Sequence, residues 1–281
     1  MNNLSNPVLE KQAKSELKYF PQLKDIEKAK DNLNGVVQYT PLTFNHHLSE
    51  RYKCNIHLKR EDLQTVRSYK IRGAYNKINS LSEDELKRGV VCASAGNHAQ
   101  GVAYSCKKAG IHGTIFMSQT TPQQKIRQVE MFGNDSIEIK LVGDSYDDAY
   151  DEALNYAKQN QCTFIHPFDD EKVIEGQGTV GLEILEKMKD PIDILFIPVG
   201  GGGLASGVGP VFKQLSPQTK IIGVEPSGAP AMKTSLEEDK IITLDKIDNF
   251  VDGAVVKRVG DLTFNICRDV LTEVVDVEEG A

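Results

Sequence analysis

The 281-residue sequence lacks several features that mark whole classes of protein. No apolar run approaches the ~18 residues that a membrane-spanning helix needs, and the first 25 residues contain no apolar stretch that would predict a signal peptide. Basic residues are not in excess: 33 Lys and Arg stand against 40 Asp and Glu, which gives a formal net charge of −7. We therefore expect neither a membrane nor a nucleic acid as a partner.

Paired cysteines and metal-binding spacings are also lacking. The five cysteines form no CxxC pair and are odd in number, which favours reduced thiols and a cytoplasmic location. The six histidines show no HExxH spacing, so we assign no metal site.

Strand and helix patterns alternate from about residue 90. Strands followed by helices of ten or more residues imply βαβ units and parallel sheets, so the fold class is α/β. The helix over 122–132 is expected to end on a left-handed cap at Gly133, and the chain ends in a further strand over 274–281. Expected strands cover 90–94, 111–117, 137–142, 162–168, 193–199 and 220–225; expected helices cover 97–108, 122–132, 145–159, 180–189 and 204–215.

A run of four glycines links one expected strand to the next helix. Residues without Cβ atoms let backbone N–H groups approach an anion closely, and the helix start behind them adds partial positive charge. The run predicts a phosphate site made of Gly200, Gly201, Gly202, Gly203 and Leu204.

The same loop also fits a dinucleotide fingerprint, Gly200-x-Gly202-x-x-Ala205, with Glu225 placed to bind a ribose. A nicotinamide-dependent dehydrogenase therefore remains an alternative on local grounds. A second fingerprint, Gly176-x-Gly178-x-x-Gly181, is weaker because its strand ends too early.

A second strand-to-helix joint carries small and polar residues. Ser94 or Asn97 could cap the helix, and the free N–H groups of its first turn could hold a carboxylate. The pattern predicts a small-molecule site formed by Ser94, Ala95, Gly96, Asn97 and His98.

The segment 68–74, "SYKIRGA", contains Lys70. By composition alone this lysine would be a solvated surface residue, because a functional amine must be desolvated or set near other cations. Arg67 and Arg72 are near enough in sequence to contribute. The flanking run 59–62 is interpreted as a solvated charge cluster.

The motifs "LKREDLQ", "SYKIRGA", "SAGNHAQG" and "PVGGGGL", in this order, resemble those of pyridoxal-phosphate enzymes of fold type II. More narrowly, the sequence is similar to threonine deaminases (threonine dehydratases) of the biosynthetic, isoleucine-pathway branch. The resemblance implies two three-layer subdomains with mostly parallel sheets: a smaller one inserted at about 62–160, and a larger one from 22–61 plus 161–281.

For the site, the resemblance implies pyridoxal 5'-phosphate as cofactor, attached to Lys70. Asn97 would bond the cofactor's phenolic oxygen, and the loop from Gly200 to Leu204 would hold its phosphate. The substrate carboxylate would be bound by Ser94, Ala95, Gly96 and His98. The implied activity converts L-threonine to 2-oxobutanoate and ammonia, and L-serine to pyruvate, in a homo-oligomer (a dimer or a tetramer).

Some parts of the family pattern are missing. The serine expected against the pyridine nitrogen and the C-terminal regulatory domain would follow residue 281, so we expect 1–281 to be an incomplete catalytic domain with weak activity. Glu225 and Ala229 fit a cation site known in some relatives, but Ala231 replaces its aspartate, which supports assigning no metal. Serine racemase and threonine synthase remain alternatives within the fold.

Overall fold

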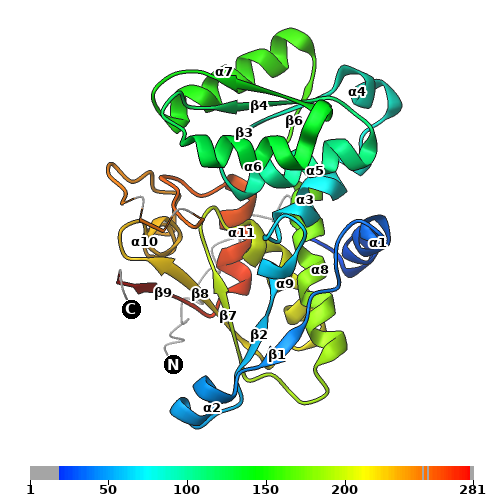
Figure 1. Cartoon of the computed structure of the whole chain (residues 1–281). Coiled ribbons are helices and arrows are strands. Elements are labelled where there is room, and N and C mark those ends of the chain that lie inside the picture. Colours follow the sequence, from blue (N-terminus) through cyan, green and yellow to red (C-terminus); the bar gives the residue numbers. More distant parts are fainter. Residues whose placement is uncertain (1–18, 249, 252, 279–281) are drawn as a thin grey trace, which may run out of the picture.

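The computed structural model describes residues 19–248, 250–251 and 253–278, so the last three residues of the expected C-terminal strand lie outside the described part. Two parallel sheets and one antiparallel strand pair are present (Figure 1). The four-stranded sheet with its helices lies at the top of the view, and the three-stranded sheet lies below it. No helix within these described ranges is long and apolar enough to cross a membrane.

The four-stranded sheet has the order β5-β4-β3-β6, with all neighbours parallel. Every residue of β3 and β4 is buried, which explains why their sequences are apolar, apart from Thr114, instead of alternating. Apolar residues of α5 and α6 pack with one set of strand side chains and those of α7 with the other, which makes three layers. The bounds are β3 Val90–Ala93, α5 Asn97–Ala109, β4 Gly113–Met117, α6 Gln123–Gly133, β5 Ile137–Leu141, α7 Tyr146–Asn160 and β6 Thr163–Phe164.

The three-stranded sheet has the parallel order β7-β8-β9. Its core combines strand residues such as Ile197 and Ile221 with side chains from four helices, among them Phe212 and Phe264. The bounds are α8 Glu171–Lys187, β7 Ile194–Pro198, α9 Gly203–Leu215, β8 Lys220–Pro226, α10 Ala231–Glu237, α11 Asp261–Val270 and β9 Glu273–Val277.

Helix α3 (Lys70–Asn79) contacts both α5 and α8 and so links the two groups of helices. Glycines allow this close contact. A Cβ on Gly101 would lie 3.2 Å from the carbonyl carbon of Lys70, and one on Gly176 would lie 2.7 Å from the Cα of Gly73. The first turn of α3 therefore packs closely against α5 on one side and α8 on another. The remaining elements are α1 (Leu23–Leu33), β1 (Leu42–Phe44), α2 (His46–Tyr52), β2 (His57–Lys59), the 3-10 turn η1 (Glu61–Leu63), α4 (Glu83–Arg88) and the 3-10 turn η2 (Asn134–Ser136).

The predicted α/β class with mostly parallel sheets is confirmed. Three local expectations are wrong. Gly133 is not a left-handed cap: its φ is −92°, Asn134 takes the positive φ instead, and the glycine is needed because the Ile137 side chain fills the space of a Cβ. The strand expected over 162–168 is only Thr163–Phe164, and the helix expected over 180–189 begins at Glu171.

The short β6 pairs with β3, so the four-stranded sheet ends at Phe164, a few residues after position 160. Chain segment 165–170 then leads from this sheet to α8. The proposed subdomain boundaries otherwise stay a prediction.

Candidate active site

Lys70 is the first residue of α3, and its side chain is partly buried. Its Nζ donates a hydrogen bond to the carbonyl oxygen of Pro167 at 2.7 Å and lies 5.6 Å from the centre of the Tyr69 ring. Burial lowers the pKa of the Lys70 amine from 10.5 to about 8. The lysine is thus a desolvated group and not the solvated surface residue that composition alone would suggest.

The start of α5 is open. Gly96 is its N-cap residue, and no side chain among the described residues caps the helix, so the expectation that Ser94 or Asn97 would do so is wrong. The Ser94 hydroxyl instead accepts the N–H of Gly96 at 3.2 Å. The exposed Asn97 is the first helical residue. An uncapped helix start leaves first-turn N–H groups for a ligand, as the predicted carboxylate site requires.

The His98 side chain points inward from α5. It is 4% exposed, and its Nε2 lies 2.8 Å from the carbonyl oxygen of Ile165, so Nε2 carries a proton. Burial, aided by the charge of Lys70, lowers the pKa of His98 to about 3, and the ring is therefore neutral. Only the backbone of His98 is left to contribute to a site at the helix start.

The glycine loop forms the start of α9. Gly202 is the N-cap residue with a φ of +90°, a conformation that favours glycine, and no side chain of the described residues caps this helix either. A Cβ on Gly201 would lie 2.4 Å from ring carbons of Phe168, and one on Gly203 would lie 2.8 Å from the Phe168 Cβ. Side chains are thus excluded here by packing, while the N–H groups of the helix start remain available for an anion.

The described contacts bring the three predicted motifs together. Pro167 accepts the bond from Lys70, and its neighbour Phe168 packs on the glycine loop. On another side, a Cβ on Gly253 would lie 3.9 Å from the Asn97 Nδ2, and a Cβ on Gly200 would lie 2.9 Å from the Ala254 oxygen. Lys70, the start of α5 and the start of α9 therefore border one region.

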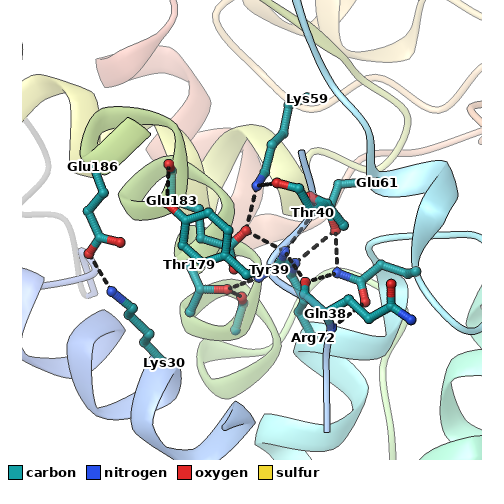
Figure 2. A network of polar contacts seen from close by, with 12 residues as sticks. Lys30, Gln38, Tyr39, Thr40, Lys59, Glu61, Arg72, Thr179, Glu183 and Glu186 are labelled. Carbon is teal, nitrogen blue, oxygen red and sulfur yellow. Dashed lines mark hydrogen bonds and ion pairs between the residues drawn. The ribbon is translucent and has the colours of Figure 1, made fainter. Parts of the chain in front are cut away.

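The expectation of a solvated charge cluster over 59–62 is wrong for Lys59 and Glu61, whereas Arg60 and Asp62 form an exposed pair. Figure 2 shows Lys59 and Glu61 in a network around Arg72, which is fully buried. The Arg72 guanidinium bonds both carboxylate oxygens of Glu61 at 2.8 Å and those of Glu183 at 2.6 and 2.9 Å, while Lys59 pairs with Glu183. Arg72 therefore ties α3 to η1 and α8. The cations do not lower the pKa of Lys70, because the whole shift comes from burial.

Glu225 is not free to bind a ribose. It is 1% exposed, and its carboxylate accepts the N–H groups of Met232 at 2.9 Å and Lys233 at 2.8 Å. The second glycine fingerprint lies within α8, where it cannot form a loop. Both observations count against the dehydrogenase alternative. Within the described ranges, no group of three His, Cys, Asp or Glu side chains could hold a metal ion.

Sequence reasoning missed the residues of the segment 166–169. Their pattern carried one weak signal, since the connection following His166 is richer in acidic residues than its neighbours. The Asp169 carboxylate accepts three N–H groups at the start of α11, including those of Leu262 and Thr263 at 3.0 and 3.1 Å. The Thr263 hydroxyl in turn donates to the Gly201 carbonyl at 2.6 Å.

A desolvated amine beside a glycine-lined helix start suits a cofactor that carries both an aldehyde and a phosphate. The amine is less basic than a free lysine and can bond to the aldehyde, while the N–H groups of the helix start can bind the phosphate. The fold and the site thus have the features of an α/β protein that uses a phosphorylated aldehyde cofactor.

The chain belongs to the family described as "Pyridoxal-phosphate dependent enzyme", whose model matches residues 33–281. Pyridoxal phosphate is the cofactor of this family.

The biosynthetic L-threonine dehydratase of Halalkalibacterium halodurans is 57% identical over 259 residues, which cover 92% of this chain and 62% of the relative. This chain thus spans less than two thirds of the length of that curated relative. The processed threonine deaminase isoform 2 of Solanum lycopersicum superposes with a TM-score of 0.85 at 43% sequence identity. The match covers 92% of this chain and 76% of the tomato chain. Maize serine racemase superposes with a TM-score of 0.88 at 32% sequence identity. The match covers 93% of this chain and 78% of the maize chain. The resemblance to threonine deaminases is confirmed.

Proposed function

We propose that this chain carries the catalytic centre of a threonine dehydratase, which converts L-threonine to 2-oxobutanoate and ammonia and L-serine to pyruvate. The observation that carries the proposal is Lys70, a partly buried amine with a pKa near 8 held beside two uncapped helix starts. The 57% identity to a biosynthetic L-threonine dehydratase supports the choice of substrate.

Pyridoxal phosphate, when bound, supplies an aldehyde that bonds to amines and a ring that withdraws negative charge from the substrate Cα. The amides of the glycine loop, from Gly200 to Leu204, would bind its phosphate, and Asn97 would bond its phenolic oxygen. The N–H groups near Ser94, Ala95, Gly96 and His98 would hold the substrate carboxylate.

Lys70 would act as the general base. An amine with a pKa near 8 has a substantial neutral fraction at physiological pH, and only the neutral form can take the Cα proton of threonine. Removal of that proton and loss of the β-hydroxyl as water leave an enamine, which hydrolyses to the 2-oxo acid and ammonia. Burial of the amine keeps competing water away from this step.

Lys70→Ala is the decisive variant, with 2-oxobutanoate formation from L-threonine measured in the presence of pyridoxal phosphate. Turnover should fall at least about 10³-fold, because the variant lacks the amine that would bind the cofactor and take the Cα proton. Lys87→Ala changes an exposed lysine of α4 and should leave turnover unchanged. Equal turnover of Lys70→Ala and the parent chain would refute the proposal.

Serine racemase is the second candidate, favoured by the likeness to the maize enzyme. The two activities separate with L-serine as substrate, since racemisation gives D-serine while dehydration gives pyruvate. D-serine formed faster than pyruvate would replace our assignment.

We also propose that the protein is a cytoplasmic homo-oligomer built on the two subdomains expected from the sequence. The free thiols, three of them buried, support a reducing compartment. Ile194 and Phe196 on the edge strand β7 are 47% and 63% exposed, an apolar surface that suits a second copy.

A further inference from the structure

The segment 165–170, "IHPFDD", contacts a different part of the site with nearly every residue. It is short and has no regular secondary structure, yet it joins the elements that carry Lys70, the glycine loop and the start of α5. Its contacts are Ile165 with His98, Pro167 with Lys70, Phe168 with the glycine loop, Asp169 with the start of α11, and Asp170 with the start of α8 and with Lys77.

The His166 side chain stabilises this segment by accepting hydrogen bonds from two of its other residues. Its Nδ1 accepts the N–H of Asp169 at 2.7 Å and that of Phe168 at 3.3 Å, which closes a turn around Pro167. The ring also packs edge-on against the Phe168 ring, with centroids 4.7 Å apart. The two hydrogen bonds fix the direction of the Pro167 carbonyl, because Pro167 lies between the residue that accepts them and the residues that donate them.

We infer that His166 is a positioning residue for Lys70: it holds the turn that aims the Pro167 carbonyl at the lysine Nζ. The inference deepens the proposed function and rests on it for its role in catalysis. His166 itself touches neither the amine nor the substrate in this scheme and acts through the carbonyl.

The carbonyl matters because it can only accept hydrogen bonds. A neutral lysine amine has two N–H groups and one lone pair. When Pro167 accepts one N–H, the lone pair must point away from Pro167. The bond at 2.7 Å thus keeps the lone pair free to receive the Cα proton and restricts the rotation of the flexible lysine chain.

Histidine can accept these two N–H groups at Nδ1 in only one protonation state. Accepting at Nδ1 places the proton on Nε2, so the ring must be neutral. Burial lowers the pKa of His166 to about 4, although the neighbouring Asp169 and Asp170 raise it, while Lys70 lowers it further. The ring therefore stays neutral at physiological pH, and the turn is closed throughout the working range.

Asparagine offers a matched replacement. Its Oδ1 is bonded to Cγ just as the Nδ1 of histidine is, and asparagine commonly accepts N–H groups two and three residues ahead. His166→Asn should therefore keep the turn, whereas His166→Leu keeps the bulk but removes the acceptor.

The test measures the pKa of Lys70 in the cofactor-free chain by NMR titration of ¹³Cε-labelled lysine. The Lys70 signal is identified as the one that is missing from the Lys70→Arg spectrum. A carbonyl stabilises an ammonium more than a neutral amine, so losing the aimed Pro167 carbonyl should lower the Lys70 pKa by about one unit in His166→Leu. His166→Asn should titrate like the parent. The titratable groups near the amine are uncharged in this range: burial raises the pKa of Tyr69 to about 12, and His98 and His166 are neutral.

An unchanged Lys70 pKa in His166→Leu, or an equal shift in His166→Asn, would overturn the inference. Should His166→Leu fail to fold, His166→Gln takes its place, since its acceptor lies one bond farther from Cγ and cannot close the same turn. The titration needs no turnover, so it stands apart from the proposed function, which is refuted by equal turnover of Lys70→Ala and the parent chain. In an active chain, His166→Leu should lower kcat about tenfold or more with little change in KM.

Discussion

Arg72 Nη1 and Glu183 Oε1 are 2.6 Å apart in a buried ion pair, although the two residues are separated by 111 positions in the sequence. The arginine also binds Glu61, and its guanidinium is therefore shared between two carboxylates (Figure 2). Arg72 lies two residues after Lys70 on α3. The pair thus joins the helix that begins with Lys70 to α8.

Arg72→Met should lower the free energy of unfolding by about 3–5 kcal/mol, because it removes the arginine shared by two buried carboxylates and leaves Glu183 with Lys59 as its remaining ion-pair partner. Urea denaturation followed by circular dichroism measures the change. Lys30→Ala breaks an ion pair with Glu186 in which both side chains are substantially exposed, and it should cost no more than about 0.5 kcal/mol. Similar costs for the two variants would contradict the role given to burial.

The network could not be predicted from the sequence. The run 59–62 has the composition of a surface cluster. Nothing in the local sequence indicates that Glu183, 124 positions further along the chain, pairs with Lys59. Contacts between residues distant in the sequence also explain why the segment around His166 was missed. Its residues Pro167, Phe168 and Asp169 contact the starts of α3, α9 and α11. By contrast, the uncapped helix start at the glycine run could be anticipated from the sequence, because glycines meet a local need for backbone access. The interest of Lys70 came only from the family resemblance, since composition alone indicated a solvated residue.

Lys70 should make stability depend on pH. Its folded pKa of about 8 lies below the ordinary 10.5, so between these values the unfolded chain binds more protons and the free energy of unfolding rises with pH. The slope from this group is at most about 1.4 kcal/mol per pH unit. The difference in unfolding free energy between the parent chain and Lys70→Met, measured in urea from pH 7.5 to 10.5, should grow in favour of the parent. A pH-independent difference would show that the amine is not desolvated.

Gly201→Ala should destabilise the chain by about 1–3 kcal/mol, since its Cβ would lie 2.4 Å from the Phe168 ring. The added Phe168→Leu change should restore part of the loss by making room. Gly253→Ala, whose nearest neighbour would be 3.9 Å away, serves as the control and should change stability by less than about 0.5 kcal/mol. Thermal unfolding is measured for five chains: the parent, Gly201→Ala, Phe168→Leu, the double variant and Gly253→Ala. Full additivity of the Gly201 and Phe168 changes would exclude direct contact.

The glycines of α8 show where pattern reasoning failed for a physical reason. Three glycines lie within the six residues 176–181, and the helix was expected to begin only at residue 180, after two of them. In the structure they lie in the helix interior, where their lost Cβ atoms let α8 approach α3 and α9 closely. The Asp170 side chain, which accepts the N–H groups of Lys172 and Val173, provides the actual start signal.

This contact gives the last prediction. A Cβ on Gly207 of α9 would lie 2.4 Å from the Ile174 oxygen and 2.5 Å from the Gly178 nitrogen, both backbone atoms of α8 that cannot rotate away. Gly207→Ala should therefore cost more than about 3 kcal/mol, despite alanine's higher helix propensity. Gly181→Ala on the facing helix is the matched comparison: its Cβ would meet the Val211 side chain at 3.2 Å, and side chains can yield. The midpoints of urea unfolding should rank parent, Gly181→Ala and Gly207→Ala in decreasing order, and a Gly207→Ala chain as stable as the parent would mean that the two helices do not pack backbone to backbone.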